Sequence, residues 1–408
     1  MANNLNSTPN ANRIQISFFG RRNAGKSSVV NALTGQPVSI VSDTKGTTTD
    51  PVSKSMEILP IGPVNIIDTA GIDDEGEIGS ARISRSLRIL AKTDITVLVV
   101  DSTLEISDYE INLIEKFQKR NIPFILLLNK TDLLGSDFEN AKHAFDKLAK
   151  ELGCPAVYFS AVSKEGINEL KKAIIEVCGN KKDKSLLGDI LSPDKMVILV
   201  TPIDESAPKG RLILPQVQTI RDILDSHCMC AVVQFEQLQD ALALLKEPPF
   251  AVVTDSQIFD KVKEEVPDNI YLTSFSILFA RFKGILDTAA EGAFSIDKLQ
   301  TGDTVLISEG CTHHRQCNDI GTVKLPSWIE KFCGKKLNFE FTSGGDFPED
   351  LSKFSLIVHC GGCMLNEKEM EYRMSCAKLQ DIPFTNYGIL IAHMNGILRR
   401  SLKIFEKK

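Results

Sequence analysis

The stretch Gly20-Arg21-Arg22-Asn23-Ala24-Gly25-Lys26-Ser27 fits the pattern G-x-x-x-x-G-K-[ST]. It follows the apolar run 14–19 and precedes the helix-forming stretch 27–34, which is the strand–loop–helix context that this pattern requires. The glycines let backbone N–H groups turn toward a phosphate, and the helix N-terminus adds the positive end of its dipole. We therefore expect a phosphate-binding loop at this point of the chain.

Individual residues of this loop have distinct expected roles. Lys26 can reach the β- and γ-phosphates of a nucleotide and is the expected catalytic cation, whereas Ser27 can ligate Mg²⁺. Gly20, Gly25 and Ser28 complete the expected phosphate-binding set.

Three further motifs follow in order. Asp68-Thr69-Ala70-Gly71 comes after the apolar run 64–67; there the acid can hold Mg²⁺ through water, and the Gly71 N–H can face the γ-phosphate. Asn129-Lys130-Thr131-Asp132 comes after the run 124–128, and Ser160-Ala161 would close over the base. Asp132 can accept two N–H groups of guanine, and an unpaired buried carboxylate is costly, so the site should select GTP over ATP.

A threonine-rich loop, Gly46-Thr47-Thr48-Thr49-Asp50, lies between the phosphate loop and Asp68. This is where a switch loop would bring a threonine to Mg²⁺. Thr48 is our choice, with Thr47 next, and a solvated loop without that role is the alternative.

Apolar runs divide the chain into α/β segments. Continuous runs alternating with helical stretches are typical of buried parallel strands in a doubly wound sheet. No internal repeat is apparent. We expect three α/β domains with these bounds: a flexible tail at 1–12, a nucleotide-binding domain at 13–178, a charged linker at 179–194, a second domain at 195–274 and a third at 275–408.

The composition narrows the class of protein. It is 43% hydrophobic and 25% charged, too apolar for a disordered chain, and its net charge of −6 counts against a dense nucleic-acid binder. The sequence has no apolar run of membrane-spanning length, and the polar N-terminus lacks the features of a signal or transit peptide. We expect a cytoplasmic protein with reduced thiols.

Six of the ten cysteines lie beyond residue 310. Cys311-Thr312-His313 follows the apolar run 305–307, and His359-Cys360-Gly361-Gly362-Cys363 follows the run 356–358. Both groups therefore sit at strand carboxyl ends, where ligands bind in open α/β sheets. From the residues alone, zinc, an iron–sulfur cluster and simple burial all remain open. In contrast, we interpret Cys228 and Cys230, at the start of an apolar run, as buried structural residues.

Residues 13–178 resemble the Era/TrmE branch of translation-factor-type GTPases. Ile72 stands where Ras-like enzymes carry a water-positioning glutamine, and Asn23 matches the asparagine that ligates K⁺ in potassium-activated members. The resemblance implies slow GTP hydrolysis stimulated by K⁺ and dimerisation. Asn23 could instead only brace the loop.

The spacing Cys311-x-His313, then His359-Cys360-x-x-Cys363, resembles the C-x-H…H-C-x-x-C signature of the HydF family of [FeFe]-hydrogenase maturation GTPases. The resemblance covers essentially the whole chain. It implies a homodimeric scaffold whose second domain mediates dimerisation and whose third domain binds a [4Fe–4S] cluster through Cys311, Cys360 and Cys363. It also implies that radical-SAM maturation enzymes and apo-hydrogenase are partners.

The fourth cluster ligand varies in that family. His313 and His359 are candidates for the fourth ligand or for a supporting role. Some members carry an acid seven residues after the first cysteine; here Asn318 stands at that position and Asp319 is adjacent.

Two other functions compete with the scaffold. One is an RNA-associated GTPase with a C-terminal zinc module, which the acidic balance and the lack of a basic stripe disfavour. The other is a redox enzyme using Cys360 and Cys363, for which no partner domain is evident.

Overall fold

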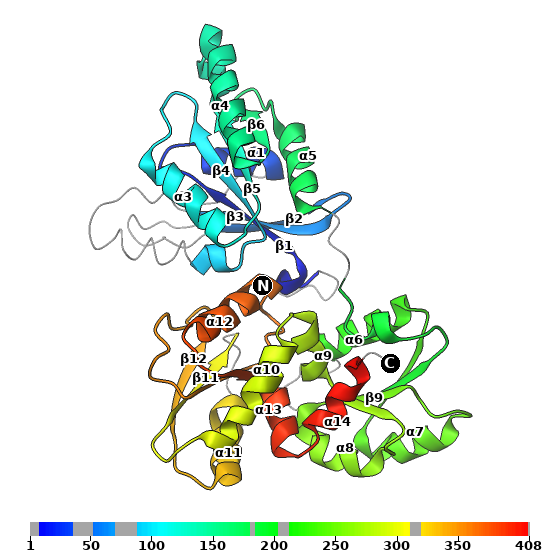
Figure 1. Ribbon diagram of the computed structural model, residues 1–408. Helices are drawn as coiled ribbons and strands as arrows, with labels where there is room; N and C mark the ends of the chain where they lie inside the picture. Colours follow the sequence, from blue (N-terminus) through cyan, green and yellow to red (C-terminus); the bar gives the residue numbers. More distant parts are fainter. Residues whose placement is uncertain are drawn as a thin grey trace, which may run out of the picture. The chain divides into compact units, whose positions relative to one another are not determined.

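The structure is a computed structural model that describes residues 8–35, 52–69, 88–179, 184–202, 212–310 and 320–406. The chain divides into two compact units, Met1–Lys182 and Asp183–Lys408, and each is described by itself. Every sheet is covered by helices, which confirms the predicted α/β class (Figure 1).

The first unit has a six-stranded sheet in the order β2-β3-β1-β4-β5-β6. All pairs are parallel except β2 with β3. The strands are β1 (Ile14–Phe19), β2 (Val52–Ile58), β3 (Gly62–Asp68), β4 (Ile95–Asp101), β5 (Phe124–Asn129) and β6 (Ala156–Phe159). The helices are α1 (Lys26–Thr34), α3 (Asp108–Lys119), α4 (Phe138–Leu152) and α5 (Ile167–Cys178).

Apolar strand residues of this sheet are buried on both faces, as their continuous runs predicted. Helices α1 and α5 cover one face and α3 and α4 the other, each with its own apolar core. The predicted nucleotide motifs at the ends of β1, β3, β5 and β6 therefore meet at the carboxyl edge of one sheet.

The second unit contains two four-stranded parallel sheets, in the orders β10-β9-β7-β8 and β12-β11-β13-β14. The first comprises β7 (Met196–Val200), α6 (Leu214–Asp225), β8 (Met229–Val233), α7 (Leu238–Leu244), β9 (Ala251–Thr254), α8 (Phe259–Glu265), β10 (Tyr271–Ser274), α9 (Phe275–Phe282) and α10 (Leu286–Ala293). The second comprises β11 (Thr304–Glu309), α11 (Leu325–Cys333), β12 (Asn338–Ser343), β13 (Leu356–His359), α12 (Glu367–Leu379), β14 (Phe384–Asn386), α13 (Tyr387–Met394) and α14 (Leu398–Leu402).

These two halves repeat one topology, which the sequence analysis did not expect. Strands β7, β8, β9 and β10 occupy the same places in their sheet as β11, β12, β13 and β14. The helix starts also correspond: Ser274 Oγ accepts from Ile277 N at 3.3 Å, and Asn386 Oδ1 accepts from Ile389 N at 2.8 Å. Equivalent positions in the two halves can therefore be compared directly.

The halves exchange their last helices. Helix α10 packs on β14 of the other half, and α14 packs on β10. A Cβ at Gly292 on α10 would lie 2.1 Å from the Phe384 carbonyl oxygen, so only glycine allows this approach. One apolar core consequently spans both sheets, which makes the second and third expected segments a single compact unit.

The remaining expectations about packing concern isolated residues. Cys228 is buried and Cys230 is half-buried on β8. Among the described helices, none has both the length and the apolar character needed to cross a membrane.

Candidate functional site

Two glycines shape the phosphate loop. Gly20 has φ +146°, and a Cβ there would lie 2.2 Å from the Val99 carbonyl oxygen. Gly25 has φ +90°, and a Cβ there would lie 2.2 Å from Asn129 Nδ2. The loop therefore needs both glycines, one against β4 and one against the guanine motif.

Lys26 folds back over the loop. Its Nζ donates to the Gly20 and Arg21 carbonyl oxygens at 2.8 and 2.6 Å, and the residue is buried. These carbonyls hold the ammonium at the phosphate loop, so a phosphate can replace them as its acceptor.

Ser27 and Asp68, the two residues predicted to hold Mg²⁺, lie together. Ser27 Oγ donates to Asp68 Oδ2 at 2.5 Å. Asp68 Oδ1 is buried and has no hydrogen-bond partner in the described part of the chain. Burial raises the pKa of Asp68, and the hydrogen bond from Ser27 and the charge of Lys26 only partly oppose it. A divalent cation would satisfy this carboxylate, so the pair fits a magnesium site.

The guanine motif is braced on several sides. Asn129 Nδ2 donates to the Ala24 carbonyl oxygen at 2.8 Å, which ties the motif to the phosphate loop. Ser160 Oγ donates to Asp132 Oδ1 at 2.6 Å, and Thr131 Oγ1 donates to the Phe159 carbonyl oxygen at 3.1 Å. The exposed Asp132 carboxylate is thus oriented before any base arrives.

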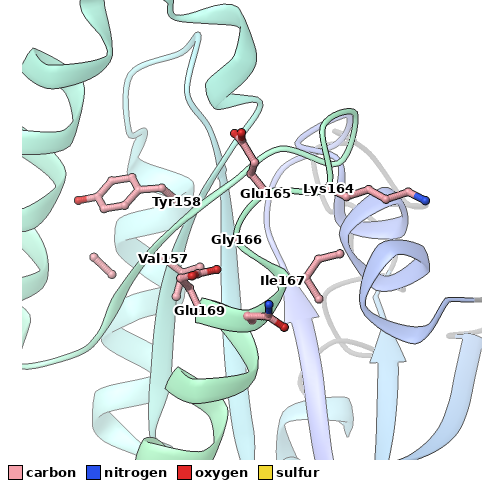
Figure 2. A pocket seen from close by; sticks show the side chains of 9 residues that line it. Val157, Tyr158, Lys164, Glu165, Gly166, Ile167 and Glu169 are labelled. Atoms are coloured by element: carbon pink, nitrogen blue, oxygen red, sulfur yellow. The ribbon is translucent and has the colours of Figure 1, made fainter.

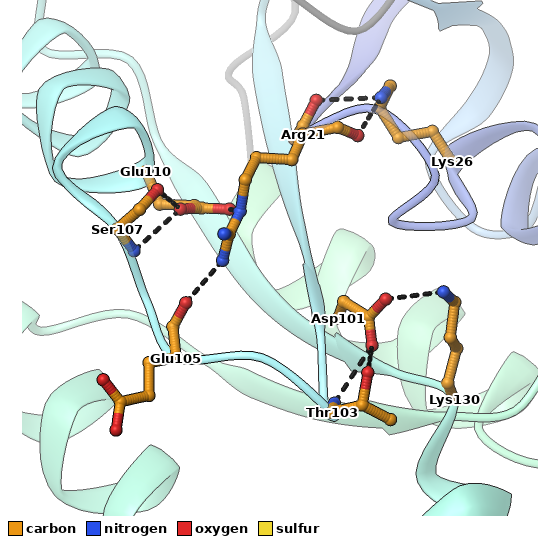
Figure 3. A network of polar contacts seen from close by, with 9 residues as sticks. Arg21, Lys26, Asp101, Thr103, Glu105, Ser107, Glu110 and Lys130 are labelled. Carbon is orange, nitrogen blue, oxygen red and sulfur yellow. Dashed lines mark hydrogen bonds and ion pairs between the residues drawn. The ribbon is translucent and has the colours of Figure 1, made fainter. Parts of the chain in front are cut away.

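Figure 3 shows two ion pairs that the sequence analysis missed. Lys130 Nζ lies 2.5 Å from Asp101 Oδ2. Burial alone would raise the pKa of Asp101, but the hydrogen bonds from Lys130 and Thr103 outweigh it and lower that pKa. Arg21 Nε lies 2.5 Å from Oε1 of the fully buried Glu110.

Glu110 belongs to a capping box with Ser107 at the start of α3. Its Oε2 accepts from Ser107 N at 2.9 Å, while its Oε1 takes the arginine of the phosphate loop. The spacing Ser107-x-x-Glu110 was a readable signal for the cap, but nothing in it indicated Arg21.

A pocket of about 440 Å³ lies behind the Ser160 loop and contains none of the predicted nucleotide residues. Figure 2 shows Tyr158 and Lys164 pointing to opposite sides, with Gly166 between them. A Cβ at Gly166 would lie 2.1 Å from the Tyr158 carbonyl oxygen, so this pocket reflects a close crossing of loop and strand.

Other predicted nucleotide residues are placed as follows. Asn23 is exposed with φ +61°, Ser28 is exposed on the first turn of α1, and Ala161 is half-buried. Thr48 and Gly71 lie outside the described residues.

At the carboxyl edge of the third sheet, Cys360 lies beside the residue that precedes Cys311. Gly310 N donates to Cys360 Sγ at 3.0 Å, and Gly362 N donates to it at 3.4 Å. Gly362 has φ +63°, a conformation that favours glycine. Two backbone donors on one sulfur favour a thiolate or a metal-bound sulfur.

Both ring nitrogens of His359 are engaged. Nε2 lies 3.1 Å from Arg373 Nη1, and Nδ1 lies 2.8 Å from the Cys360 carbonyl oxygen. Because arginine can only donate, Nε2 must accept, and the proton of the neutral ring sits on Nδ1. Burial, and then the charge of Arg373, lower the pKa of His359 to about 3.

The described donor set fits a thiolate-bound metal group. Cys360 and Cys363 are both half-buried. Cys311, His313, Asn318 and Asp319 lie outside the described residues. Of the three predicted cysteine ligands, Cys360 and Cys363 lie in the described ranges. Within those ranges no group of three or more His, Cys, Asp or Glu side chains is gathered.

The sheet, the phosphate loop and the guanine motif together define a P-loop GTPase. Residues 15–130 match the family described as 50S ribosome-binding GTPase. Residues 186–284 match the hydrogen maturase F dimerization domain, and residues 287–404 match the hydrogen maturase F tetramerization domain. The chain therefore belongs to the hydrogen maturase F (HydF) family, as the cysteine spacing predicted, and it is a GTP-hydrolysing enzyme.

Curated relatives match the first part of the chain. GTPase Der of Mycoplasmopsis pulmonis is 33% identical over 188 residues, 43% of this chain and 43% of that protein. The tRNA modification GTPase MnmE of Nitrosomonas europaea is 32% identical over 167 residues, 41% of this chain and 35% of that protein. The chain spans less than half the length of these relatives, which resemble it as GTPases.

Among solved structures, the FeoB G-domain of Methanococcus jannaschii is 31% identical. The match covers 41% of this chain and 98% of the FeoB chain, with a TM-score of 0.32.

The boundary between the two HydF matches, near residue 285, lies between α9 and α10, so the first sheet falls within the dimerization match and the second sheet within the tetramerization match. The half expected to bind the cluster is thus the half that matches a tetramerization domain. The two matches support oligomerisation of the chain.

Proposed function

We propose that this chain is a GTP-driven scaffold for assembly of the [FeFe]-hydrogenase active site. It would hold a [4Fe–4S] cluster through Cys311, Cys360 and Cys363. Its cargo would be a diiron precursor, received with the help of radical-SAM enzymes and delivered to apo-hydrogenase, in a cytoplasmic setting that keeps the thiols reduced. The observation that carries the proposal is the Cys360 sulfur, which accepts two backbone N–H groups beside Gly310.

The cluster would supply an iron with an exchangeable position to which the precursor docks and from which it leaves. The chain's own residues have other tasks. Cys360 and Cys363 supply thiolates at a sheet edge, and the Gly310 and Gly362 N–H groups stabilise the negative sulfur.

In the GTPase unit, Lys26 would neutralise the β- and γ-phosphates, and Ser27, Asp68 and Thr48 would hold Mg²⁺ directly or through water. The Gly71 N–H would face the γ-phosphate. Asn23 would ligate K⁺, which would act as a charge-neutralising cation in a slow hydrolysis. The exposed position of Asn23 leaves its side chain accessible for that role.

Anaerobic purification tests the proposal. We expect iron and sulfide in equal amounts, about four of each per chain, and an EPR signal after reduction. Cys311→Ser should lose the iron and keep GTP hydrolysis, because the two sites belong to different compact units. One zinc per chain without iron would favour the zinc-module alternative instead.

Potassium dependence is a separate test. Hydrolysis should be faster in K⁺ than in Na⁺ at equal ionic strength, and Asn23→Ala should remove the difference. If the variant keeps the full K⁺ effect, Asn23 only braces the loop.

A further inference from the structure

Arg373, on α12, is the largest fully buried side chain of the chain's described part. Its Nη2 donates to Glu369 Oε1 at 2.6 Å and to the Gly344 carbonyl oxygen at 2.5 Å. Its Nη1 donates to His359 Nε2 at 3.1 Å. Glu369 balances the buried charge, as a buried guanidinium requires. The contact with His359 is a further hydrogen bond, and His359 in turn contacts the Cys360 carbonyl oxygen.

The repeated half provides an internal comparison. In the cysteine-bearing half, neighbouring strands place Thr342, Ser308 and His359 side by side. The equivalent row in the other half is Val233, Val200 and Thr254.

The side chains of the first row are linked by hydrogen bonds. Thr342 Oγ1 donates to Ser308 Oγ at 3.0 Å, and Arg373 Nη1 reaches the same oxygen at 3.5 Å. Helix α8, which follows β9 as α12 follows β13, contains no arginine. The equivalent sheet edge in the other half therefore forms without a histidine or an arginine. The hydrogen-bond network occurs in the half that carries the cysteines.

The network ends at the Cys360 peptide. The Nδ1–H of His359 donates to the Cys360 carbonyl oxygen at 2.8 Å. That hydrogen bond fixes the orientation of the Cys360 carbonyl group. The side-chain sulfur of the same residue accepts from Gly310 N and Gly362 N. Because arginine occupies Nε2, the imidazole is kept as an Nδ1–H donor and has no free nitrogen for a metal.

We propose that Arg373 is a positioning residue that acts through His359 to prepare the Cys360 sulfur for an iron–sulfur cluster, so that His359 supports the cluster and does not ligate it. This inference rests on the proposed function. The sequence analysis left His359 either as the fourth cluster ligand or as a supporting residue, and this inference assigns it the supporting role.

Two substitutions of His359 separate support from ligation. His359→Asn places an amide near the Nδ1 position and keeps a donor for the Cys360 carbonyl. His359→Gln places its amide near Nε2 and loses that donor. Iron affinity after anaerobic reconstitution should fall ~10-fold or more in His359→Gln and stay within ~2-fold of the original in His359→Asn. Equal loss in both variants would overturn the supporting role.

Pulsed EPR supplies a readout that does not depend on affinity. With ¹⁵N-labelled histidine, the reduced cluster of the unaltered protein should show no coupling strong enough for a directly bound imidazole. A strong histidine coupling that disappears in His359→Asn would show that His359 is a ligand and would overturn the inference.

Arg373 is tested against a matched arginine. Arg373→Met should lower iron affinity ~10-fold and shift the EPR g-values of the remaining cluster. Arg400→Met is the control, because Arg400 also holds backbone carbonyls, those of Val266 and Pro267 at 2.7 and 2.9 Å, away from the cysteines. It should leave the cluster signal unchanged even if it lowers the melting temperature.

The outcomes distinguish this inference from the function on which it rests. An unaltered protein that binds no iron contradicts the proposed function. An unaltered protein that binds iron, with Arg373→Met matching it in affinity and g-values, contradicts only the role of Arg373.

Discussion

Arg21 in the phosphate loop donates through Nε to Glu110 Oε1 at 2.5 Å, across 89 residues of sequence. Lys26 in turn donates to the Arg21 carbonyl oxygen at 2.6 Å. The loop that binds phosphate is therefore tied to the start of α3 by an ion pair whose acid is fully buried. The side chain of Arg21 thus anchors the loop to Glu110, whereas its carbonyl oxygen accepts the hydrogen bond from Lys26.

This ion pair predicts unequal effects for its two partners. Arg21→Ala leaves the buried Glu110 carboxylate without its cation and should lower the free energy of unfolding of the GTPase unit by about 3 kcal/mol. Glu110→Gln keeps an acceptor for Ser107 N and frees an arginine that can turn to water, so its loss should be about 1 kcal/mol. Hydrogen exchange of peptides from the first unit in urea measures both. Equal losses would contradict the buried-charge argument.

Gly25 predicts a specific loss of nucleotide binding. Gly25→Ala would place a Cβ 2.2 Å from Asn129 Nδ2 at φ +90°, so the guanine motif must shift. We expect GDP affinity to fall at least ~10-fold, since the strain of about 1–3 kcal/mol falls on the site itself. Gly35→Ala is the matched control: Gly35 also has a positive φ, +66°, at the other end of α1, but a Cβ there meets nothing within 4 Å. Fluorescence titration with a labelled GDP should show that only the first variant binds weakly.

Asp68 predicts opposite effects on stability and activity. Burial raises its pKa, so the folded protein binds this proton more readily than the unfolded chain, and stability falls as pH rises through the raised pKa. In nucleotide-free protein, Asp68→Asn should therefore leave stability unchanged or raise it by up to about 1 kcal/mol, more at pH 8 than at an acidic pH below the raised pKa. Magnesium-dependent hydrolysis should fall ~100-fold or more. Thermal unfolding at the two pH values checks the first part, and a destabilised variant at pH 8 would contradict it.

How far the sequence predicts this structure depends on whether a feature is local. The phosphate loop and the guanine motif are contiguous in sequence, and continuous apolar runs such as 124–128 predicted buried strands. In contrast, β2 (Val52–Ile58) alternates polar and apolar residues and pairs antiparallel at the sheet edge, so it lacked that signal.

Features that depend on pairing across the fold could not be predicted. Arg373 lies in a helix of mostly charged and polar residues, where an arginine is expected to face water, but it is buried against Ser308, His359 and Gly344. The internal repeat was missed because its sequence similarity is concentrated in one stretch of each half, 273–286 and 385–398, while the loops differ in length and chemistry.

The repeat yields a matched test of assembly. Strands β8 and β12 are equivalent edge strands, and Val232 and Phe341 occupy the same register position, opposite Leu199 and Ile307 respectively. Both side chains are exposed, 43% and 40%. Because β8 lies in the segment matching a dimerization domain and β12 in the one matching a tetramerization domain, we expect each edge to serve a different contact.

A lysine at an edge strand opposes pairing with a second chain, since it brings a charge to the strand that would join. Val232→Lys should therefore reduce the assembly to monomers, whereas Phe341→Lys should stop it at dimers. Light scattering of the full chain measures the mass, and circular dichroism with hydrogen exchange of peptides from the second unit confirms that each variant is folded. If both substitutions leave the same species, the two edges do not have separate roles in assembly.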